Sequence, residues 1–218
     1  MEKGLCCIVG AGVFYDHTDF LRQGEYKIAA DGGYDTFVRC GMTPDLVIGD
    51  LDSVKESIGD GIDTIPLLPI KDDTDMLAAL KIGMEKGYQK FYLLGGTGGR
   101  RISHTFANIQ LLQYNPSVQC FLFDEEEVLF CISNGKVVFG KECQGYLSVF
   151  SFSSNCYGVT EQNLAYELED QELSNQFPLG VSNAFIGKES LISVKQGVLL
   201  IVVNKECLPY IICENGCY

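Results

Sequence analysis

The fold of this chain is indicated most clearly by the segment LVIGDLDS at residues 46–53. A short apolar run at residues 46–48 leads through a glycine to two acids, Asp50 and Asp52. Apolar and β-branched residues are typical of a buried strand, and side chains two residues apart in extended backbone leave the same face. The segment therefore predicts a buried strand that delivers two carboxylates to one place.

Other acids follow apolar segments in the same way. Asp31 is followed by Gly32 and Gly33, Asp45 follows a proline, and residues 71–75 read KDDTD. Successive strands of a parallel sheet end at one edge, where α/β proteins bind their ligands. Carboxylates gathered there repel one another unless a cation neutralises them, and Mg²⁺ prefers oxygen ligands and often accompanies nucleotide phosphates. We therefore expect a magnesium and nucleotide site at this edge.

Each acidic segment has a simpler explanation when it is taken alone. Asp52 or Ser53 could cap a helix, and Asp75 falls in the first turn of an expected helix, where its charge suits the helix dipole. The recurrence of acids at successive strand ends favours the ligand site over independent caps.

A glycine-rich segment, LLGGTGGRR at residues 93–101, follows another expected strand. Glycine turns that lead into a helix expose backbone N–H groups to anions, and an arginine can hold phosphate through two hydrogen bonds. The segment predicts either a phosphate site or a flexible connection. His104 and Asn108 follow one helical turn apart and are expected to share a face.

The first half alternates between strand and helix patterns. We expect strands at residues 5–10, 26–31, 46–49, 64–68, 91–94 and 119–123, and helices at 75–86 and 104–114, with Thr74 as an N-cap. This alternation predicts an α/β domain with a parallel, Rossmann-like sheet.

The second half shows short alternating segments and little helix. We expect strands at residues 128–132, 136–139, 147–152, 165–168, 190–194 and 198–203, with a hairpin at Asn134-Gly135. The pattern predicts a C-terminal all-β sandwich or barrel. The domain boundaries that we expect are 1–124 and 125–218.

Composition excludes several classes of partner. The chain has 16 basic and 29 acidic residues and a net charge of −13, which argues against a nucleic acid. No apolar run is long enough for a membrane span. The ten cysteines form no C-x-x-C pair, and the N-terminal sequence does not resemble a signal peptide. We therefore expect free thiols and a cytoplasmic protein. Cys213 and Cys217 could form a disulfide, but nothing in the sequence requires it.

Taken together and in this order, the motifs resemble the thiamine pyrophosphokinase (thiamine diphosphokinase) family. They are DGG at 31–33, GDLDS at 49–53, KDDTD at 71–75, GGR at 98–100 and GVSN at 180–183. The resemblance implies an α/β domain, a β-sandwich and a homodimer that binds thiamine where the two kinds of domain meet across the interface. It also implies transfer of a pyrophosphoryl group from ATP to the hydroxyl of thiamine, with release of AMP.

The resemblance also implies roles for individual residues. Asp50, Asp52 and Asp75 would be metal ligands and catalytic acids, with Asp31 as a further acid of the cluster. Lys71 would also be a catalytic residue. Residues expected on the triphosphate or nucleotide side are Gly32, Lys71, Thr74, Arg100 and His104. Residues expected to contact thiamine are Ser103, Ser182 and Asn183.

One position departs from the family pattern. The family usually has an acid directly before the histidine, whereas this chain has Ser103, and an additional residue leaves Arg100 or Arg101 as the nucleotide arginine. Serine cannot supply the negative charge that favours cationic thiamine. A Mg²⁺-dependent pyrophosphokinase or phosphotransferase acting on another heterocyclic alcohol, or a non-catalytic thiamine- or nucleotide-binding module, is therefore an alternative. We expect a cluster aspartate to accept the proton.

Overall fold

The computed structural model describes residues 3–68 and 72–214. These residues fold into two compact units. The first unit comprises the chain up to Leu111 together with Ser117–Glu125, and the second comprises Leu112–Pro116 and the chain from Glu126 onward. Each unit is compact by itself, and the two are considered in turn.

The first unit is built on a parallel sheet. Its strands are β1 (Lys3–Val9), β2 (Tyr26–Ala30), β3 (Leu46–Gly49), β4 (Asp63–Pro66), β5 (Tyr88–Leu94) and β6 (Gln119–Phe123). Within this unit they lie in the order β6-β5-β1-β2-β3-β4, and every neighbouring pair is parallel. This confirms the expected α/β fold.

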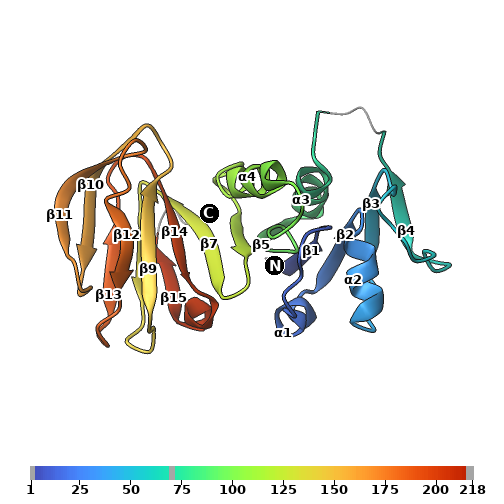
Figure 1. Cartoon of the computed structure of the whole chain (residues 1–218), viewed down its shortest axis with the longest axis horizontal. Helices are drawn as coiled ribbons and strands as arrows, with labels where there is room; N and C mark the ends of the chain where they lie inside the picture. Colours follow the sequence, from blue (N-terminus) through green and yellow to red (C-terminus); the bar gives the residue numbers. More distant parts are fainter. Residues whose placement is uncertain (1–2, 69–71, 215–218) are drawn as a thin grey trace. The chain divides into compact units, whose positions relative to one another are not determined.

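Helices cover both faces of this sheet. They are α1 (Thr18–Arg22), α2 (Gly33–Arg39), α3 (Asp75–Glu85) and α4 (Ile102–Leu111). Figure 1 shows α1 and α2 on one side of the sheet and α3 and α4 on the other. This is the arrangement that right-handed crossovers produce when the strand order reverses between β1 and β5. The loops after β1 and β5 therefore flank the switch point, where open α/β sheets bind ligands.

The core of the first unit explains why its central strands are apolar throughout. Ile8, Ile28, Ile48 and Leu93 lie on central strands and are fully buried or nearly so. Helices on both faces bury the central strands, which favours continuous apolar runs over alternation. The run at residues 46–48 is such a segment, and the strand predicted there is confirmed.

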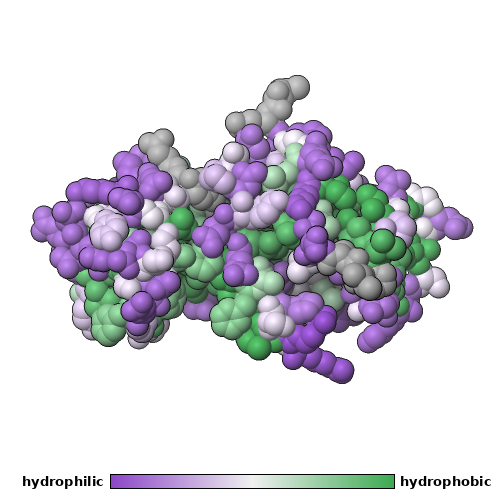
Figure 2. Space-filling view, turned by 90° about the horizontal axis from the view of Figure 1, so that it is seen from above, coloured by the Kyte–Doolittle hydropathy of each residue, from purple (hydrophilic) through white to green (hydrophobic). Residues whose placement is uncertain are grey.

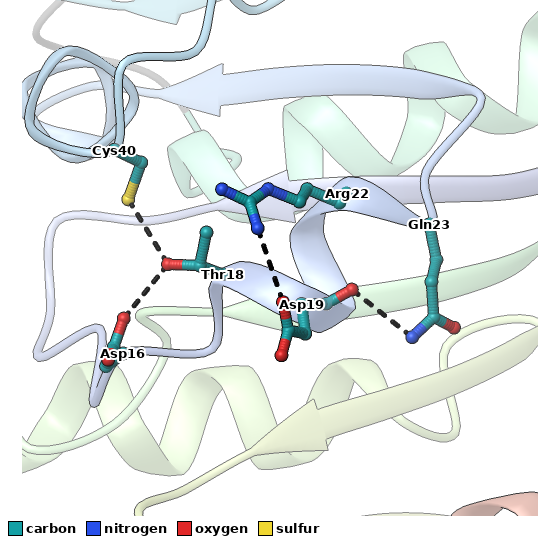
Figure 3. Close-up of polar contacts among 6 residues, drawn as sticks. All are labelled: Asp16, Thr18, Asp19, Arg22, Gln23 and Cys40. Atoms are coloured by element: carbon teal, nitrogen blue, oxygen red, sulfur yellow. Dashed lines mark hydrogen bonds and ion pairs between the residues drawn. The ribbon is translucent and has the colours of Figure 1, made fainter.

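Two helices of the first unit were not predicted. Helix α1 has five residues and its N-cap makes no side-chain hydrogen bond. Figure 3 shows its local contacts: the Thr18 hydroxyl donates to Asp16 at 3.0 Å, and Arg22 pairs with Asp19 at 3.4 Å. One turn leaves no periodic pattern in the sequence, and the glycine that begins α2 disguises the start of that helix. Strand β4 is exposed and ends earlier than the predicted segment 64–68.

The strands of the second unit pair antiparallel and form two sets. One has the order β12-β9-β14-β7 and the other β11-β10-β13-β8-β15. The strands are β7 (Glu127–Ser133), β8 (Lys136–Phe139), β9 (Tyr146–Ser151), β10 (Asn155–Gln162), β11 (Leu168–Ser174), β12 (Gly180–Ala184), β13 (Ser190–Ser193), β14 (Val198–Asn204) and β15 (Ile211–Glu214), with a 3₁₀ helix η1 at Lys205–Tyr210. The all-β domain predicted for this half is confirmed, and its sheets are coloured yellow to red in Figure 1.

The hairpin predicted at Asn134-Gly135 is wrong. This turn joins β7 and β8, which belong to different sheets, and the turn at 195–197 likewise joins β13 to β14 across the sheets. The two turns bond to each other: Gly197 N–H donates to the Asn134 side chain at 3.0 Å, and Val194 N–H donates to the Gly135 carbonyl at 2.9 Å. A turn dipeptide predicts a reversal of the chain, but the pairing of its flanking strands depends on distant partners.

Other errors in this half have a compositional cause. The strand predicted at 165–168 is replaced by β11, which begins at Leu168 and is mostly exposed and acidic. Strands β10, β12 and β15 were not predicted. Gly158 has a left-handed backbone inside β10, and its polar neighbours conceal the strand pattern.

The cysteines follow the expectation in part. Eight are free thiols, namely Cys6, Cys7, Cys40, Cys120, Cys131, Cys143, Cys156 and Cys207. Burial raises the pKa of Cys7 and of Cys120 to about 12, so these thiols remain protonated and act as small apolar residues. Cys213 is disulfide-bonded, which corrects the expectation of a free thiol there; Cys217 lies outside the described residues. Among residues 3–68 and 72–214, no helix has the length and hydropathy of a membrane span.

Candidate active site

Three carboxylates meet at the carboxyl edge of the parallel sheet. Asp31 follows β2, and Asp50 and Asp52 follow the neighbouring β3. One oxygen from each of these side chains lies within 4.8 Å of the others. The convergence predicted from the acidic strand ends is therefore present for these three residues.

The backbone at this cluster is tightly constrained. Asp31 and Leu51 have left-handed φ angles of 51° and 64°, which cost a non-glycine residue on the order of 1–3 kcal/mol each. Gly49 has a φ of 153°, and a Cβ there would lie 3.0 Å from the Asp31 Cα. The Asp31 N–H donates to the Ile48 carbonyl at 2.8 Å. The two strand ends thus approach so closely that only glycine fits at position 49.

The oxygens of this cluster suit a hard cation. Asp31 Oδ1 is buried and has no hydrogen-bond partner among the described residues. Asp50 Oδ1 accepts the Asp52 N–H at 3.3 Å, and Asp52 Oδ1 accepts the Ser53 hydroxyl at 3.0 Å. A buried carboxylate oxygen without a donor is costly, and a divalent cation with oxygen ligands would satisfy it.

The segment that begins α3 is placed differently from this cluster. Thr74 is the N-cap and its hydroxyl accepts the Leu77 N–H at 3.2 Å, which confirms the predicted cap. Asp75 is the first helical residue and is half-buried. Among the described residues, the acid that lies within 4.8 Å of Asp50 and Asp52 is Asp31, and Asp75 is not part of this cluster. Asp73 pairs with Lys81 at 2.6 Å. Lys71 lies outside the described residues.

Two glycine loops join at the switch point. Gly12 N–H donates to the Gly95 carbonyl at 2.8 Å, and Val13 N–H donates to the Thr97 carbonyl at 2.9 Å. A Cβ at Gly12 would lie 2.6 Å from the Gly95 carbonyl oxygen. Only glycine permits this approach, so the loop predicted as either a phosphate site or a flexible connection is held by backbone hydrogen bonds.

The residues after this loop divide between surface and core. Arg100, Arg101, Ser103 and His104 are exposed. Asn108 is buried, and its amide donates to the Gly96 carbonyl at 2.7 Å. His104 and Asn108 therefore have different surroundings, because Asn108 supports the glycine loop from inside the unit.

Asp45 does not belong to this edge. It precedes β3 and accepts the Lys27 N–H at 2.8 Å, at the opposite end of the strands from Asp31. The expectation that Pro44-Asp45 marks the ligand edge is wrong, because its carboxylate precedes a strand rather than following one.

In the second unit, the two residues expected to contact thiamine differ in exposure. Ser182 is exposed and has a left-handed φ of 60°. Asn183 is buried: its amide donates to the Tyr166 carbonyl at 2.6 Å and to Glu161 at 2.8 Å, and its oxygen accepts the N–H of Tyr166 and of Ala184 at 2.9 Å. Both polar atoms of Asn183 are thus engaged inside the unit, which leaves Ser182 as the accessible member of the pair.

Glu161, beside Asn183, was not singled out from the sequence. Its side chain is 1% exposed and its Oε1 has no partner among the described residues. Burial raises the pKa of Glu161 to about 7, and the hydrogen bond from Asn183 opposes this shift. Gly10 and Gly12 were also missed; the signal for them was a glycine pair directly after the first apolar strand.

These features together define a class of protein. A parallel sheet whose ligand edge carries carboxylates and glycine loops is typical of α/β enzymes that act on nucleotides. Two family models match the chain. "Thiamin pyrophosphokinase, catalytic domain" matches residues 17–122, and "Thiamin pyrophosphokinase, vitamin B1 binding domain" matches residues 136–199.

Individual relatives agree with these models. The chain is 28% identical over 195 residues to thiamine pyrophosphokinase of Bacillus subtilis, covering 86% of this chain and 91% of the relative. A crystal structure of thiamine pyrophosphokinase from Bacillus subtilis is similar, with a TM-score of 0.83, 25% identity, and coverage of 92% and 99% of the two chains. That of thiamin pyrophosphokinase from Geobacillus thermodenitrificans has a TM-score of 0.81, 26% identity, and coverage of 94% and 100%.

The chain belongs to the thiamin pyrophosphokinase family. It contains both the catalytic domain and the vitamin B1 binding domain of that family, and so it is an enzyme with thiamine pyrophosphokinase function. The catalytic domain implies that it uses ATP.

Proposed function

We propose that the chain transfers the pyrophosphoryl group of ATP to the hydroxyl of thiamine in a Mg²⁺-dependent reaction that releases AMP. The observation that carries this proposal is the cluster of Asp31, Asp50 and Asp52, in which a buried Asp31 oxygen has no donor among the described residues. The cluster lies within residues 17–122, which the catalytic-domain model matches.

Asp50 and Asp52 would hold the metal, with Asp31 completing the set of oxygens. Asp75 remains a proposed ligand on the phosphate side, at the start of α3, together with Thr74 and Lys71. When bound, Mg²⁺ would neutralise negative charge on the phosphates and on the departing AMP. We assign no residue as general base beyond the aspartates of the cluster, because a loose transition state depends mainly on alignment and charge neutralisation.

The glycine loop would lie against the nucleotide, together with Gly32. Arg100 or Arg101 would bind the phosphates or ribose, and both residues are exposed. His104 follows in the first turn of α4. The backbone hydrogen bonds between the loops after β1 and β5 would hold these two loops in place beside the nucleotide.

On the thiamine side, we propose direct contacts for Ser182 and Ser103, which are both exposed. Asn183 would act indirectly, because its polar atoms already bond Glu161, Tyr166 and Ala184. Ser103 can donate or accept a hydrogen bond but carries no charge, so the selectivity for thiamine over other heterocyclic alcohols is the part of the proposal that most needs a substrate panel.

We propose a homodimer that uses the second unit. Large apolar side chains are exposed at and near β12, the terminal strand of its sheet in the described part of the chain; they are Tyr146, Tyr166, Phe177, Leu179 and Val181. Exposed apolar groups beside an unpaired sheet edge favour association. A sedimentation mass near 24.0 kDa, instead of twice this value, would exclude the dimer.

We place the division of roles at residues 1–124 for catalysis and 125–218 for thiamine binding and dimerisation, and the protein in the cytoplasm. Figure 2 shows a face on which hydrophilic residues are interspersed with hydrophobic ones, and the net charge of −13 gives no reason to propose a nucleic acid or a membrane as partner. Thiamine binding by an isolated 1–124 fragment would contradict the division of roles. Recovery of the protein outside the cytoplasmic fraction of lysed cells would contradict the proposed location.

The direct test of the reaction is product analysis after mixing the protein with ATP, Mg²⁺ and thiamine. We expect thiamine diphosphate and AMP in equal amounts, and Asp52→Asn should lower kcat by about 10²–10³, as when one transition-state contact is removed. Asp60→Asn, an exposed acid in the same connection, is the matched control and should retain parental turnover. Parental AMP production by Asp52→Asn would contradict the metal assignment, and AMP formed with another alcohol but not with thiamine would favour the alternative substrate.

A further inference from the structure

Two acids of the cluster, Asp50 and Asp52, lie at the start of a connection that has little structure of its own. Residues 51–62 contain no helix or strand. Asp50 and Asp52 therefore cannot be positioned by a continuous ladder of backbone hydrogen bonds, unlike the strand that precedes them. Something outside this connection must hold it, because three carboxylates within 4.8 Å repel one another and would drive the loop away from Asp31.

The first turn of α2 contacts this connection through Asp35. The Asp35 carboxylate accepts the Lys55 N–H at 3.0 Å and 3.3 Å, one distance to each oxygen, and the Glu56 N–H at 3.1 Å. Consecutive backbone donors on one carboxylate fix the local chain direction. Asp35 is thus engaged as an acceptor for the loop and is not a member of the acidic group.

Tyr34, the preceding residue, holds the next part of the same connection. Its side chain is 5% exposed, and its hydroxyl accepts the Gly59 N–H at 3.1 Å and donates to the Ser57 carbonyl at 3.3 Å. A buried hydroxyl that both donates and accepts has a single favourable orientation. Tyr34 therefore fixes the connection a few residues beyond the part that Asp35 holds.

The same turn is joined to the cluster itself. Asp31 lies three residues before Tyr34, and its carbonyl accepts the Tyr34 N–H at 3.2 Å. A Cβ at Gly32 would lie 3.3 Å from the Ser53 Cβ, so this glycine packs against the end of the acidic segment. One short stretch, residues 31–35, thus supplies one acid of the cluster and holds the connection that follows the other two.

We propose that Tyr34 and Asp35 are positioning residues that hold residues 50–59 so that Asp50 and Asp52 face Asp31 before a metal ion binds. This inference rests on the proposed function, because it assumes that the cluster binds Mg²⁺. The two residues touch neither metal nor substrate. They lower the free-energy cost of bringing the three carboxylates together. Replacing either residue therefore weakens metal binding, although all three aspartates are still present.

The test compares Tyr34→Phe and Asp35→Ala with the parent. Residues that orient metal ligands typically contribute 10–100-fold in metal affinity, so we expect the Mg²⁺ concentration for half-maximal turnover to rise by roughly tenfold in each variant. Saturating Mg²⁺ should restore most of kcat, whereas it should not restore Asp52→Asn, which lacks a ligand. Tyr88→Phe, which alters a tyrosine that is also buried, and Asp19→Asn, which alters an exposed acid, are matched controls with parental Mg²⁺ dependence.

A second readout does not depend on turnover. Mn²⁺ binding to each protein without ATP, followed by electron paramagnetic resonance, should weaken by a similar factor in both variants. Hydrogen exchange at the amides of Lys55, Glu56 and Gly59 should accelerate in the variant that removes the acceptor of each. Asp35→Asn keeps one carbonyl oxygen as an acceptor, and we expect its Mn²⁺ affinity to lie between those of Asp35→Ala and the parent. If the alanine variant does not fold, Asp35→Asn replaces it in the test.

The outcomes separate this inference from the proposed function. Parental Mn²⁺ affinity and Mg²⁺ dependence in folded Tyr34→Phe and Asp35→Asn would overturn the positioning role. Loss of kcat that excess Mg²⁺ does not restore would also overturn it. If the parent binds Mn²⁺ but forms no AMP from ATP and thiamine, the proposed reaction fails, and the Mn²⁺ comparison still decides the role of Tyr34 and Asp35.

Discussion

Asp31 has two energetically costly features, which are typical of residues that bind a ligand. Its φ of 51° lies in the left-handed region, and its Oδ1 is buried without a donor among the described residues. Both features cost stability, and such costs concentrate at functional sites. The sequence predicted the position of this acid, through the two glycines that follow it, but could not reveal the unusual backbone or the missing hydrogen bond.

The second of those glycines provides a test at the residue scale. A Cβ at Gly33 would lie 1.9 Å from the Val9 carbonyl oxygen, a contact with backbone that cannot move without displacing β1. We expect Gly33→Ala to lower the free energy of unfolding by about 3 kcal/mol, at the upper end for overpacking, as measured by urea denaturation. Gly59→Ala is the control, since its nearest contact would be 3.6 Å and it should change stability by less than about 1 kcal/mol. Equal stability of the two variants would contradict the packing described here.

Elements differed in how well the sequence predicted them, and length and burial explain the difference. Helix α3 has eleven residues, a capping threonine and a periodic apolar face, so its pattern was recognisable. Helix α1 has five residues and no side-chain cap, so no pattern could develop. In the second unit, the sheet to which β8 belongs was unpredictable, because the local turn is compatible with either pairing and distant strands decide it.

The link between β10 and β12 gives a prediction at the element scale. The Asn183 amide on β12 donates to the buried carboxyl of Glu161 on β10, whose pKa is raised from 4.5 to about 7 by burial. Because the folded state holds this proton more tightly than the unfolded chain, the contribution of Glu161 to stability is present below pH 4.5 and is lost as the pH rises to about 7.

Glu161→Gln should remove this dependence, because glutamine does not ionise. Between pH 5 and pH 8, we expect the free energy of unfolding of the parent to fall by about 2–3 kcal/mol relative to this variant, measured by urea unfolding at both pH values. Glu189→Gln, an exposed acid, should keep the parental dependence. A constant difference between the parent and Glu161→Gln across this range would show that Glu161 ionises normally.

At the scale of the whole molecule, the two kinds of domain bring their polar residues together in different ways. The α/β unit gathers its acids by ending parallel strands at one edge, a rule simple enough to predict Asp31, Asp50 and Asp52 from local patterns. The same rule misled at Asp45, where an acid beside an apolar run precedes its strand. The β unit gathers residues such as Glu161 and Asn183 through long-range pairing, so their contact could not be inferred from spacing.

The supporting contacts were also beyond the sequence. Asp35 and Tyr34 hold a connection about 20 residues away, and neither is part of a recognisable motif. The backbone bonds between the loops after β1 and β5 depend on a strand order that reverses within the sheet. Such contacts become visible only when the topology is known, whereas the strand-end acids are visible from composition and periodicity alone.

The most direct measurement of the central claim is anomalous diffraction from crystals of the protein grown with Mn²⁺ and a non-hydrolysable ATP analogue. We expect an anomalous peak within about 2.5 Å of oxygens of Asp50 and Asp52, beside Asp31, with the phosphates of the analogue on its open side. A peak located away from these three aspartates, with their carboxylates bonded only to protein or water, would contradict the account.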